Sequence, residues 1–179
     1  MGLEFSTKQI AVILAVVAVV SVSVAFFYVY EVRYVPTDSM DGEPQDYEIP
    51  TIPKGSAILV QKYSSQSDID SLKVGDVILF YNTSNHLDTV HRIIDITEVD
   101  ANGHIVKVTT HGDNKSPGTN ETVNSSDIHG KVVGVSKELG GFVHFVQSST
   151  ILLVMIIVIL IVMVSVVWDI IKIRRNEGQ

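Results

Sequence analysis

The chain has 179 residues, a formal net charge of −7 at pH 7 and no cysteine, and 46% of its residues are hydrophobic. The absence of cysteine excludes disulfide bonds, thiolate nucleophiles and cysteine-bound metal sites. The acidic balance argues against a nucleic-acid partner, because proteins bind phosphate groups largely with basic side chains.

Two uncharged apolar runs lie near the ends of the chain. Residues 10–30 contain no charged side chain over 21 positions, and residues 151–168 contain none over 18. A helix rises about 1.5 Å per residue, so either run is long enough to cross a hydrocarbon layer of roughly 30 Å. We predict transmembrane helices at residues 10–30 and 151–171, with an external domain at residues 31–150 between them.

The first run has a second interpretation, a cleaved secretory signal. Ser23, Val24 and Ala25 provide small residues of the kind that precede a cleavage site. The run ends in an aromatic cluster at residues 26–30, however, and such clusters are typical of anchors at the membrane interface. We therefore favour an uncleaved helix.

Basic residues predict the orientation. Lys172, Arg174 and Arg175 follow the second run directly, and basic flanks usually stay in the cytoplasm. This predicts a cytoplasmic tail at residues 172–179 and a short cytoplasmic N-terminus at residues 1–9. The expected localisation is the cell membrane, multi-pass, with the external domain on the extracytoplasmic side.

Short β-branched runs separated by Gly, Pro and Asn predict a mainly β external domain with an antiparallel sheet. The predicted strands are residues 56–62, 76–81, 89–96, 105–110 and 131–136. No run of helical period lies between them. Residues 41–53 and 115–126 are rich in turn-forming and polar residues and are predicted to be loops.

The residues able to carry chemistry in this domain are serine, histidine, aspartate and lysine. Each candidate also has a structural interpretation: Ser39 as a turn residue, His91 as a hydrogen-bonded strand residue, and Asp76 and Asp113 as turn residues. No H-E-x-x-H pattern or zinc-type spacing occurs, so no metal is expected. Lys107 lies in a predicted strand, where a solvated position is favoured over a role as base.

The order of four short motifs is more specific than any one of them. Ser39-Met40, Gly75-Asp76-Val77, Val90-His91-Arg92 and Gly112-Asp113-Asn114 follow one another between the two apolar runs. This set resembles the type I signal peptidase family, in its archaeal and endoplasmic-reticulum branch. In that branch a serine followed by methionine is the nucleophile, and a histidine replaces the lysine general base of the common bacterial branch.

The resemblance implies a role for each motif residue. Ser39 would be the nucleophile and His91 the general base, with Asp113 orienting His91. The oxyanion would be bound by the backbone N–H of Ser39, with the Thr37 hydroxyl as a second donor. Asp76 would be a supporting acid, with a structural role favoured.

The sequence departs from the family pattern in two places. The family usually reads S-M-x-P, but an acidic stretch follows Met40, which we interpret as an insertion beside the site that alters substrate access. The family also tends to carry a second aspartate a few residues after G-D-N. Here Asn120 or Glu121 stands in that region, so Glu121 is a further possible supporting acid.

The resemblance implies a serine endopeptidase that removes signal peptides from exported preproteins and needs no cofactor. Its partners would be these preproteins and membrane lipid, and the protein translocation channel is a further possible partner. Substrates would carry small side chains one and three residues before the cut. Two alternatives remain open: a non-catalytic, membrane-anchored β module, and a peptidase specialised for particular precursors.

Overall fold

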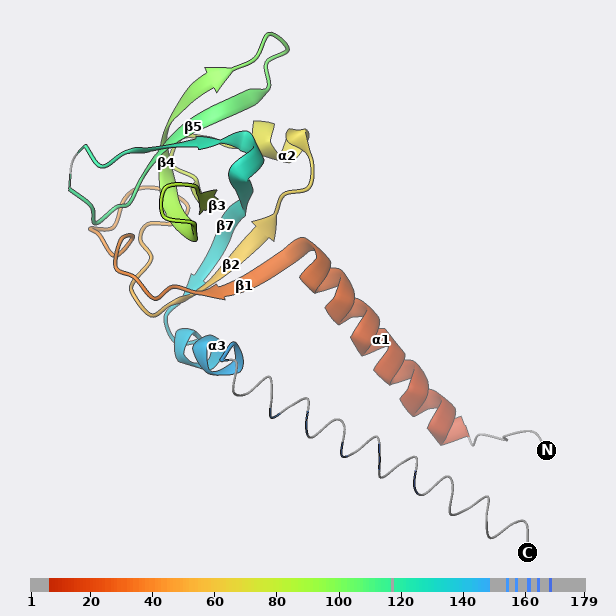
Figure 1. Cartoon of the computed structure of the whole chain (residues 1–179). Coiled ribbons are helices and arrows are strands. Elements are labelled where there is room, and N and C mark those ends of the chain that lie inside the picture. Colours follow the sequence, from red (N-terminus) through yellow and green to blue (C-terminus); the bar gives the residue numbers. More distant parts are fainter. Residues whose placement is uncertain are drawn as a thin grey trace, which may run out of the picture.

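The computed structural model describes residues 7–116 and 118–148, together with Val154, Ile157, Ile161, Val164 and Trp168. In chain order the elements are α1 (Thr7–Val29), β1 (Tyr30–Tyr34), β2 (Ala57–Lys62), α2 (Gln66–Asp70), β3 (Val77–Asn82), β4 (Leu87–Val99), β5 (Ile105–His111), β6 (Glu121–Asn124), the 3-10 helix η1 (Ser125–Asp127), β7 (Ile128–Ser136) and α3 (Gly140–Val146). Figure 1 shows α1 projecting away from the strands and leading directly into β1.

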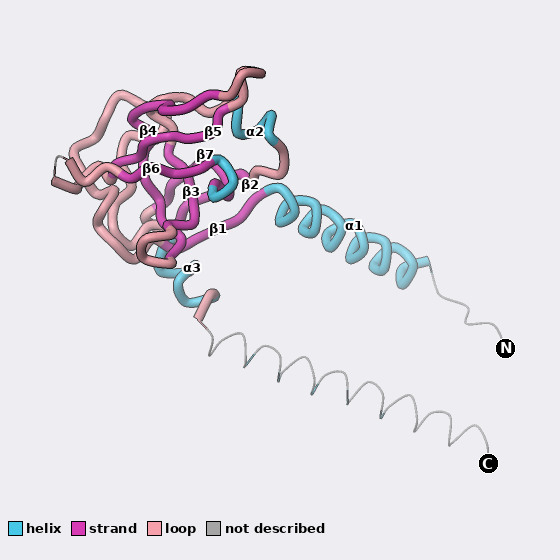
Figure 2. Tube along the Cα trace, turned by 45° about the horizontal axis from the view of Figure 1, so that its top comes forward, coloured by secondary structure: helices cyan, strands magenta, loops and turns pink. Residues whose placement is uncertain are grey.

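The strands form one seven-stranded sheet in the order β1-β2-β7-β3-β4-β5-β6. Every neighbouring pair is antiparallel. Figure 2 shows the strands gathered into one body, with α1 outside it. The prediction of a mainly β, antiparallel domain is confirmed.

Two hydrophobic clusters lie on opposite faces of this sheet. Along β3, Val77 and Leu79 belong to one cluster, and Ile78 and Phe80 belong to the other. Alternate side chains of a strand point to opposite faces, so a strand buried on both faces is apolar throughout. This explains why the run in β3 shows no alternation of apolar and polar residues.

All five predicted strands are present, and two further strands were missed. β4 runs from Leu87 to Val99, longer than predicted, because its far half pairs with β5. β1 shares only Tyr30 with the first apolar run and its other residues were assigned to no element, whereas β6 was assigned to a loop. Both are short strands at the ends of the strand order. Each is defined by its pairing, with β2 or with β5, rather than by a strand pattern in its own sequence.

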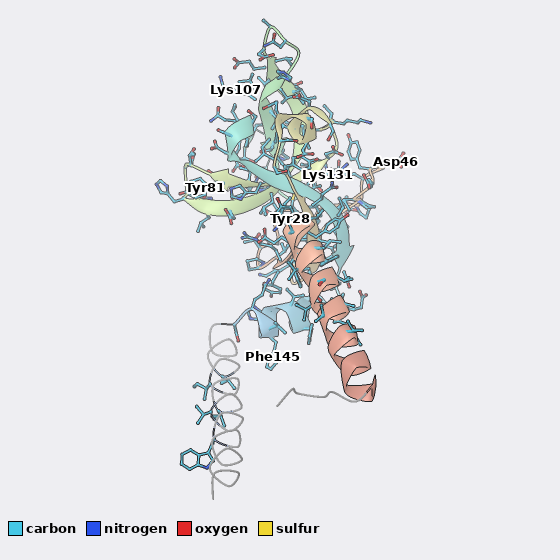
Figure 3. The ribbon with its side chains drawn as sticks, turned by 90° about the vertical axis from the view of Figure 1, so that its right-hand side faces the viewer. Tyr28, Asp46, Tyr81, Lys107, Lys131 and Phe145 are labelled. Atoms are coloured by element: carbon cyan, nitrogen blue, oxygen red, sulfur yellow. The ribbon has the colours of Figure 1, made fainter. Side chains whose placement is uncertain are left out.

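Two short helices were also not predicted. α2 begins with a capping box, in which the Ser65 side chain accepts a hydrogen bond from the backbone N–H of Asp68 while the Asp68 carboxylate accepts from the backbone of Ser65. α3 packs against β1, where the Tyr34 and His144 ring centroids are 4.5 Å apart. Figure 3 shows Phe145 of α3 at the same end of the domain as α1.

The helix α1 covers most of the first predicted span, and β1 begins at Tyr30. Among the residues that the structure describes, no helix is both long enough and apolar enough to cross a membrane. The second predicted span and the predicted tail at residues 172–179 lie outside the described residues, apart from five helical positions between Val154 and Trp168. The membrane-spanning roles of residues 10–30 and 151–171 therefore stay predictions of the sequence.

Two adjacent glycines in α3 provide a test of how this helix is attached. A Cβ at Gly140 would overlap the carbonyl oxygen of Gly55, whereas a Cβ at Gly141 meets nothing within 4 Å. We expect Gly140→Ala to lower the free energy of unfolding by about 1–3 kcal/mol, the usual cost of overpacking. Gly141→Ala should be neutral or stabilising by up to about 1 kcal/mol, since alanine favours helix.

The measurement is urea unfolding of the detergent-solubilised full chain, followed by circular dichroism. Equal unfolding midpoints for the two variants would contradict the contact between α3 and the residue Gly55.

Candidate active site

A cavity of about 600 Å³ lies between β1 and β4. Its floor includes Ile58 from β2 and Leu79 from β3, and its wall includes Ser39 and His91. The structure therefore brings together the two residues that the sequence singled out as nucleophile and base, although 52 positions separate them in the chain. Thr37 and Lys115 line the same cavity.

Ser39 is held from two sides. On one side, Met40 is fully buried, and its carbonyl oxygen accepts a hydrogen bond of 3.0 Å from the N–H of Ile52. On the other, the carbonyl oxygen of Ser39 accepts from the N–H of Asn114 at 2.9 Å, and the Asn114 amide donates to the carbonyl of Asp38 at 3.1 Å. The backbone around Ser39 is thereby fixed beside the G-D-N turn.

The hydroxyl groups of Thr37 and Ser39 are 3.4 Å apart. Thr37 is exposed and Ser39 is half-buried. This arrangement places a second hydroxyl group beside the candidate nucleophile, and the role of Thr37 as an oxyanion donor stays a prediction.

His91 lies in the centre of the sheet, opposite Ile78 of β3, and only 1% of its surface is exposed. Its Nδ1 is 2.7 Å from Oε2 of Glu121. An ionised carboxylate only accepts hydrogen bonds, so Nδ1 carries the proton and Nε2 presents a lone pair. In this tautomer Nε2 is the ring nitrogen that can accept a proton.

Gly112 lies between the Nε2 edge of His91 and the Ser39 backbone. A Cβ built on Gly112 would lie 2.9 Å from Nε2 of His91 and 2.8 Å from the carbonyl oxygen of Ser39. Glycine is therefore needed here for close approach. Within the described part of the chain, no hydrogen bond joins the Ser39 hydroxyl to His91, and such bonds often tighten only when substrate binds.

Burial lowers the pKa of His91 from its ordinary value, because the desolvated imidazolium is disfavoured. The carboxylate of Glu121 opposes this effect by attracting the imidazolium. Lys115 and His111 lower the pKa of His91 further through repulsion between like charges. His91 thus stays neutral, and available as a base, to a lower pH than an exposed histidine.

The prediction that Asp113 orients His91 needs correction. Both carboxylate oxygens of Asp113 accept from Arg92, at 2.9 Å from Nε and 2.6 Å from Nη2. His91 and Arg92 are consecutive in β4, so their side chains leave opposite faces of the strand. Asp113 is committed to the Arg92 face, and Glu121 is the acid that reaches His91.

Arg92 is the most heavily bonded side chain near the site, and sequence reasoning did not identify its role. It is buried, and it also donates to the carbonyl oxygens of Gly75 at 2.8 Å and Ile49 at 2.9 Å. The ring of Tyr47 lies 5.0 Å from its guanidinium carbon, within cation–π range. Its position after His91 in a motif is the only sequence signal that could have pointed to it.

The contacts of Asp76 are with the turn before β3 and with β7. Its Oδ1 pairs with Lys131 at 2.8 Å, and its Oδ2 accepts from the N–H of Lys73 at 3.0 Å. It does not contact His91. The carboxylate therefore closes the turn before β3 and links β3 to β7.

The acidic stretch after Met40 packs into the fold. Ile49 and Ile52 are buried in the same cluster as Met40, and the Thr51 hydroxyl donates to the carbonyl oxygens of Met40 at 3.1 Å and Gly42 at 3.0 Å. None of residues 41–53 is among the described residues that line the cavity. The structure therefore gives no support to the interpretation of this stretch as a control on substrate access.

No group of three or more histidines and carboxylates that could hold a metal ion occurs among the described residues. The expectation of a metal-free, cofactor-free site stays a prediction.

The sequence model of one protein family, described as "Signal peptidase, peptidase S26", matches residues 7–116. The matched stretch contains Ser39, His91 and Asp113 and ends before Glu121. A comparison with curated proteins found no match.

The Arg92–Asp113 pair leads to a prediction about stability. Asp113→Asn leaves a buried guanidinium without its counter-charge, which typically costs about 3–5 kcal/mol of unfolding free energy. The control is Glu98→Gln, which breaks an exposed pair with Lys107 and should cost at most about 1 kcal/mol. Urea unfolding of the full chain measures both, and similar losses in the two variants would contradict a structural role for the buried pair.

Proposed function

Because the chain belongs to the signal peptidase family, peptidase S26, we propose that it is a serine endopeptidase of the archaeal and endoplasmic-reticulum branch, with Ser39 as nucleophile and His91 as general base. The family supports a hydrolase that acts on preproteins bearing signal peptides. The single observation that carries the finer assignment is that His91, whose Nδ1 is paired with Glu121, lines the same cavity as Ser39.

The proposed reaction begins when the Ser39 oxygen attacks the carbonyl carbon of the scissile peptide and Nε2 of His91 takes the hydroxyl proton. The carboxylate of Glu121 stabilises the imidazolium that forms. His91 then gives the proton to the leaving amine, which breaks the peptide bond and leaves an acyl group on Ser39. Water, deprotonated by His91, releases the acyl group and restores the serine.

The developing oxyanion needs donors already in place. The backbone N–H of Ser39 is the first, and the Thr37 hydroxyl, 3.4 Å from the Ser39 hydroxyl, is suited to be the second. Removing one such donor typically lowers the rate by about 10²–10³-fold.

The cavity also suits the proposed substrate. Ile58 and Leu79 give it an apolar floor, and β1, which is a terminal strand of the sheet, forms one wall. An extended peptide can add to a strand edge through its backbone, and shallow apolar pockets below it admit small side chains. This supports preproteins with small residues before the cut.

The proposal includes anchoring in the cell membrane through residues 10–30 and 151–171, with both termini in the cytoplasm and the sheet domain outside. It rests on the two uncharged runs and on the basic residues that follow the second. Lipid would then be a constant partner, and enzyme and preprotein would meet on one surface, which favours the reaction by proximity. Contact with the translocation channel is part of the same proposal.

A non-catalytic β module is the second candidate. Its support is the absence of a hydrogen bond between Ser39 and His91 in the described part of the chain. A peptidase restricted to particular precursors would use the same chemistry, and only the choice of substrate separates it from general processing.

The first test is cleavage of a labelled preprotein by membranes containing the wild type, Ser39→Ala, His91→Ala and His91→Lys. We expect product from the wild type only, since the carboxylate of Glu121, which contacts residue 91, would keep a lysine there in its protonated form, which cannot accept the serine proton. Folding and insertion of each variant are checked by protease protection. Undiminished cleavage by Ser39→Ala would reject the serine mechanism, and cleavage of none of several preproteins by the wild type would favour either a specialised substrate or the non-catalytic module.

The assignment of Glu121 gives a prediction with a pH signature. Glu121→Gln removes the carboxylate that stabilises the imidazolium, so kcat should fall by up to about 10⁴-fold. The same change removes an effect that raises the pKa of His91, so the acid limb of kcat/KM should move to lower pH.

Profiles of cleavage rate against pH for the wild type and Glu121→Gln check both effects. A variant with wild-type kcat and an unmoved acid limb would show that Glu121 is not the partner of the base.

A further inference from the structure

Lys115 joins the G-D-N turn to the acid that holds His91. Its backbone N–H donates to the carbonyl oxygen of Gly112 at 2.9 Å, which fixes where its side chain starts. Its Nζ lies 3.2 Å from Oε1 of Glu121, while the other carboxylate oxygen is 2.7 Å from Nδ1 of His91. Glu121 therefore bridges the ammonium group of Lys115 and the imidazole of His91.

The carboxylate of Glu121 would be less well held without this contact. The side chains of Glu121 and Lys115 are 26% and 32% exposed, and the terminal torsion of a glutamate is broad. An ion pair this exposed adds little to the free energy of folding. Its effect is therefore on the orientation of one carboxylate, rather than on the stability of the domain.

Lys115 also lines the same cavity as Ser39 and His91. Its positive charge thus faces the space in which the proposed proton transfers occur.

We propose that Lys115 is a positioning residue: it holds Glu121 against His91 and, as a positive charge that lines the same cavity as the imidazole, keeps that base neutral between turnovers. This inference rests on the proposed function of the Ser39–His91 site.

The charges around His91 come from three elements. Glu121 of β6 favours the imidazolium, whereas Lys115 of the G-D-N turn and His111 of β5 disfavour it. From β3, the ring of Phe80 lies 6.1 Å from the His91 ring and carries no charge. Removing Lys115 removes one of the charges that disfavour the imidazolium, while Glu121 still favours it. The pKa of His91 should therefore rise.

Lys115 could alternatively be the general base itself, because a lysine fills that role in the common bacterial branch. A base must be unprotonated, and the carboxylate of Glu121 at 3.2 Å favours the charged ammonium. The structure therefore favours the positioning role, and the experiment separates the two.

The test compares Lys115→Met, Lys115→Arg and Lys107→Met in the full-length, detergent-solubilised chain. Lys107 is the matched control, since it also forms an exposed pair with a glutamate, Glu98. Figure 3 shows Lys107 toward the end of the domain opposite α1. Two quantities are measured: kcat/KM for a labelled preprotein against pH, and the titration of His91 by NMR.

We expect Lys115→Met to move the acid limb of kcat/KM and the NMR titration of His91 to higher pH, the reverse of the shift expected for Glu121→Gln. Lys115→Arg, which keeps the charge, should restore the wild-type profile, and Lys107→Met should not change it. Loss of packing alone would lower the rate without moving the limb.

Two outcomes would overturn the proposal. Unchanged profiles and titration in Lys115→Met would show that Lys115 does not act on His91, and complete loss of cleavage at every pH would make Lys115 the candidate base. The NMR titration needs no substrate, so a wild type that cleaves nothing would reject the proposed function while the coupling of Lys115 to His91 is still measured.

Discussion

The buried ion pair between Arg92 and Asp113 is the contact on which the arrangement of this domain depends. A guanidinium taken out of water is costly unless its charge is balanced and its N–H groups are bonded. Arg92 meets this requirement through Asp113 and the carbonyl oxygens of Gly75 and Ile49, with Tyr47 over its plane. These partners come from the G-D-N turn, the turn before β3 and the stretch after Met40. One side chain of β4 thus joins three loops that have no strand pairing of their own.

The same pair decides which acid is available for chemistry. Because His91 and Arg92 are neighbours in one strand, they face opposite sides, and each needs a carboxylate on its own side. Asp113 neutralises Arg92, so Glu121, at the start of β6, is left for His91. The G-D-N turn nevertheless serves the site, since Asn114 donates to the carbonyl oxygens of Asp38 and Ser39, and Gly112 leaves room for Nε2 of His91 near the Ser39 backbone.

The electrostatic setting of His91 then follows from its burial and from where the chain places three charged or titratable groups. Burial disfavours the imidazolium, Glu121 favours it, and Lys115 and His111 add to the effect of burial. A base that is neutral at rest, with a carboxylate ready to stabilise its protonated form, has the properties needed to take a proton from a serine. Lys115 contacts that carboxylate and lines the cavity, which makes its charge part of the site.

The sequence by itself determined the mainly β class and five of the seven strands, because β-branched runs between turn residues are local signals, and it selected Ser39 and His91 through short motifs. Only the tertiary structure decided the terminal strands β1 and β6, whose pairing partners are β2 and β5. It also decided that Asp113 pairs with Arg92 while Glu121 and Lys115 belong with His91. The reason is physical: which acid meets which base depends on the face from which each side chain leaves its strand and on where loops distant in sequence cross, and no local pattern records either.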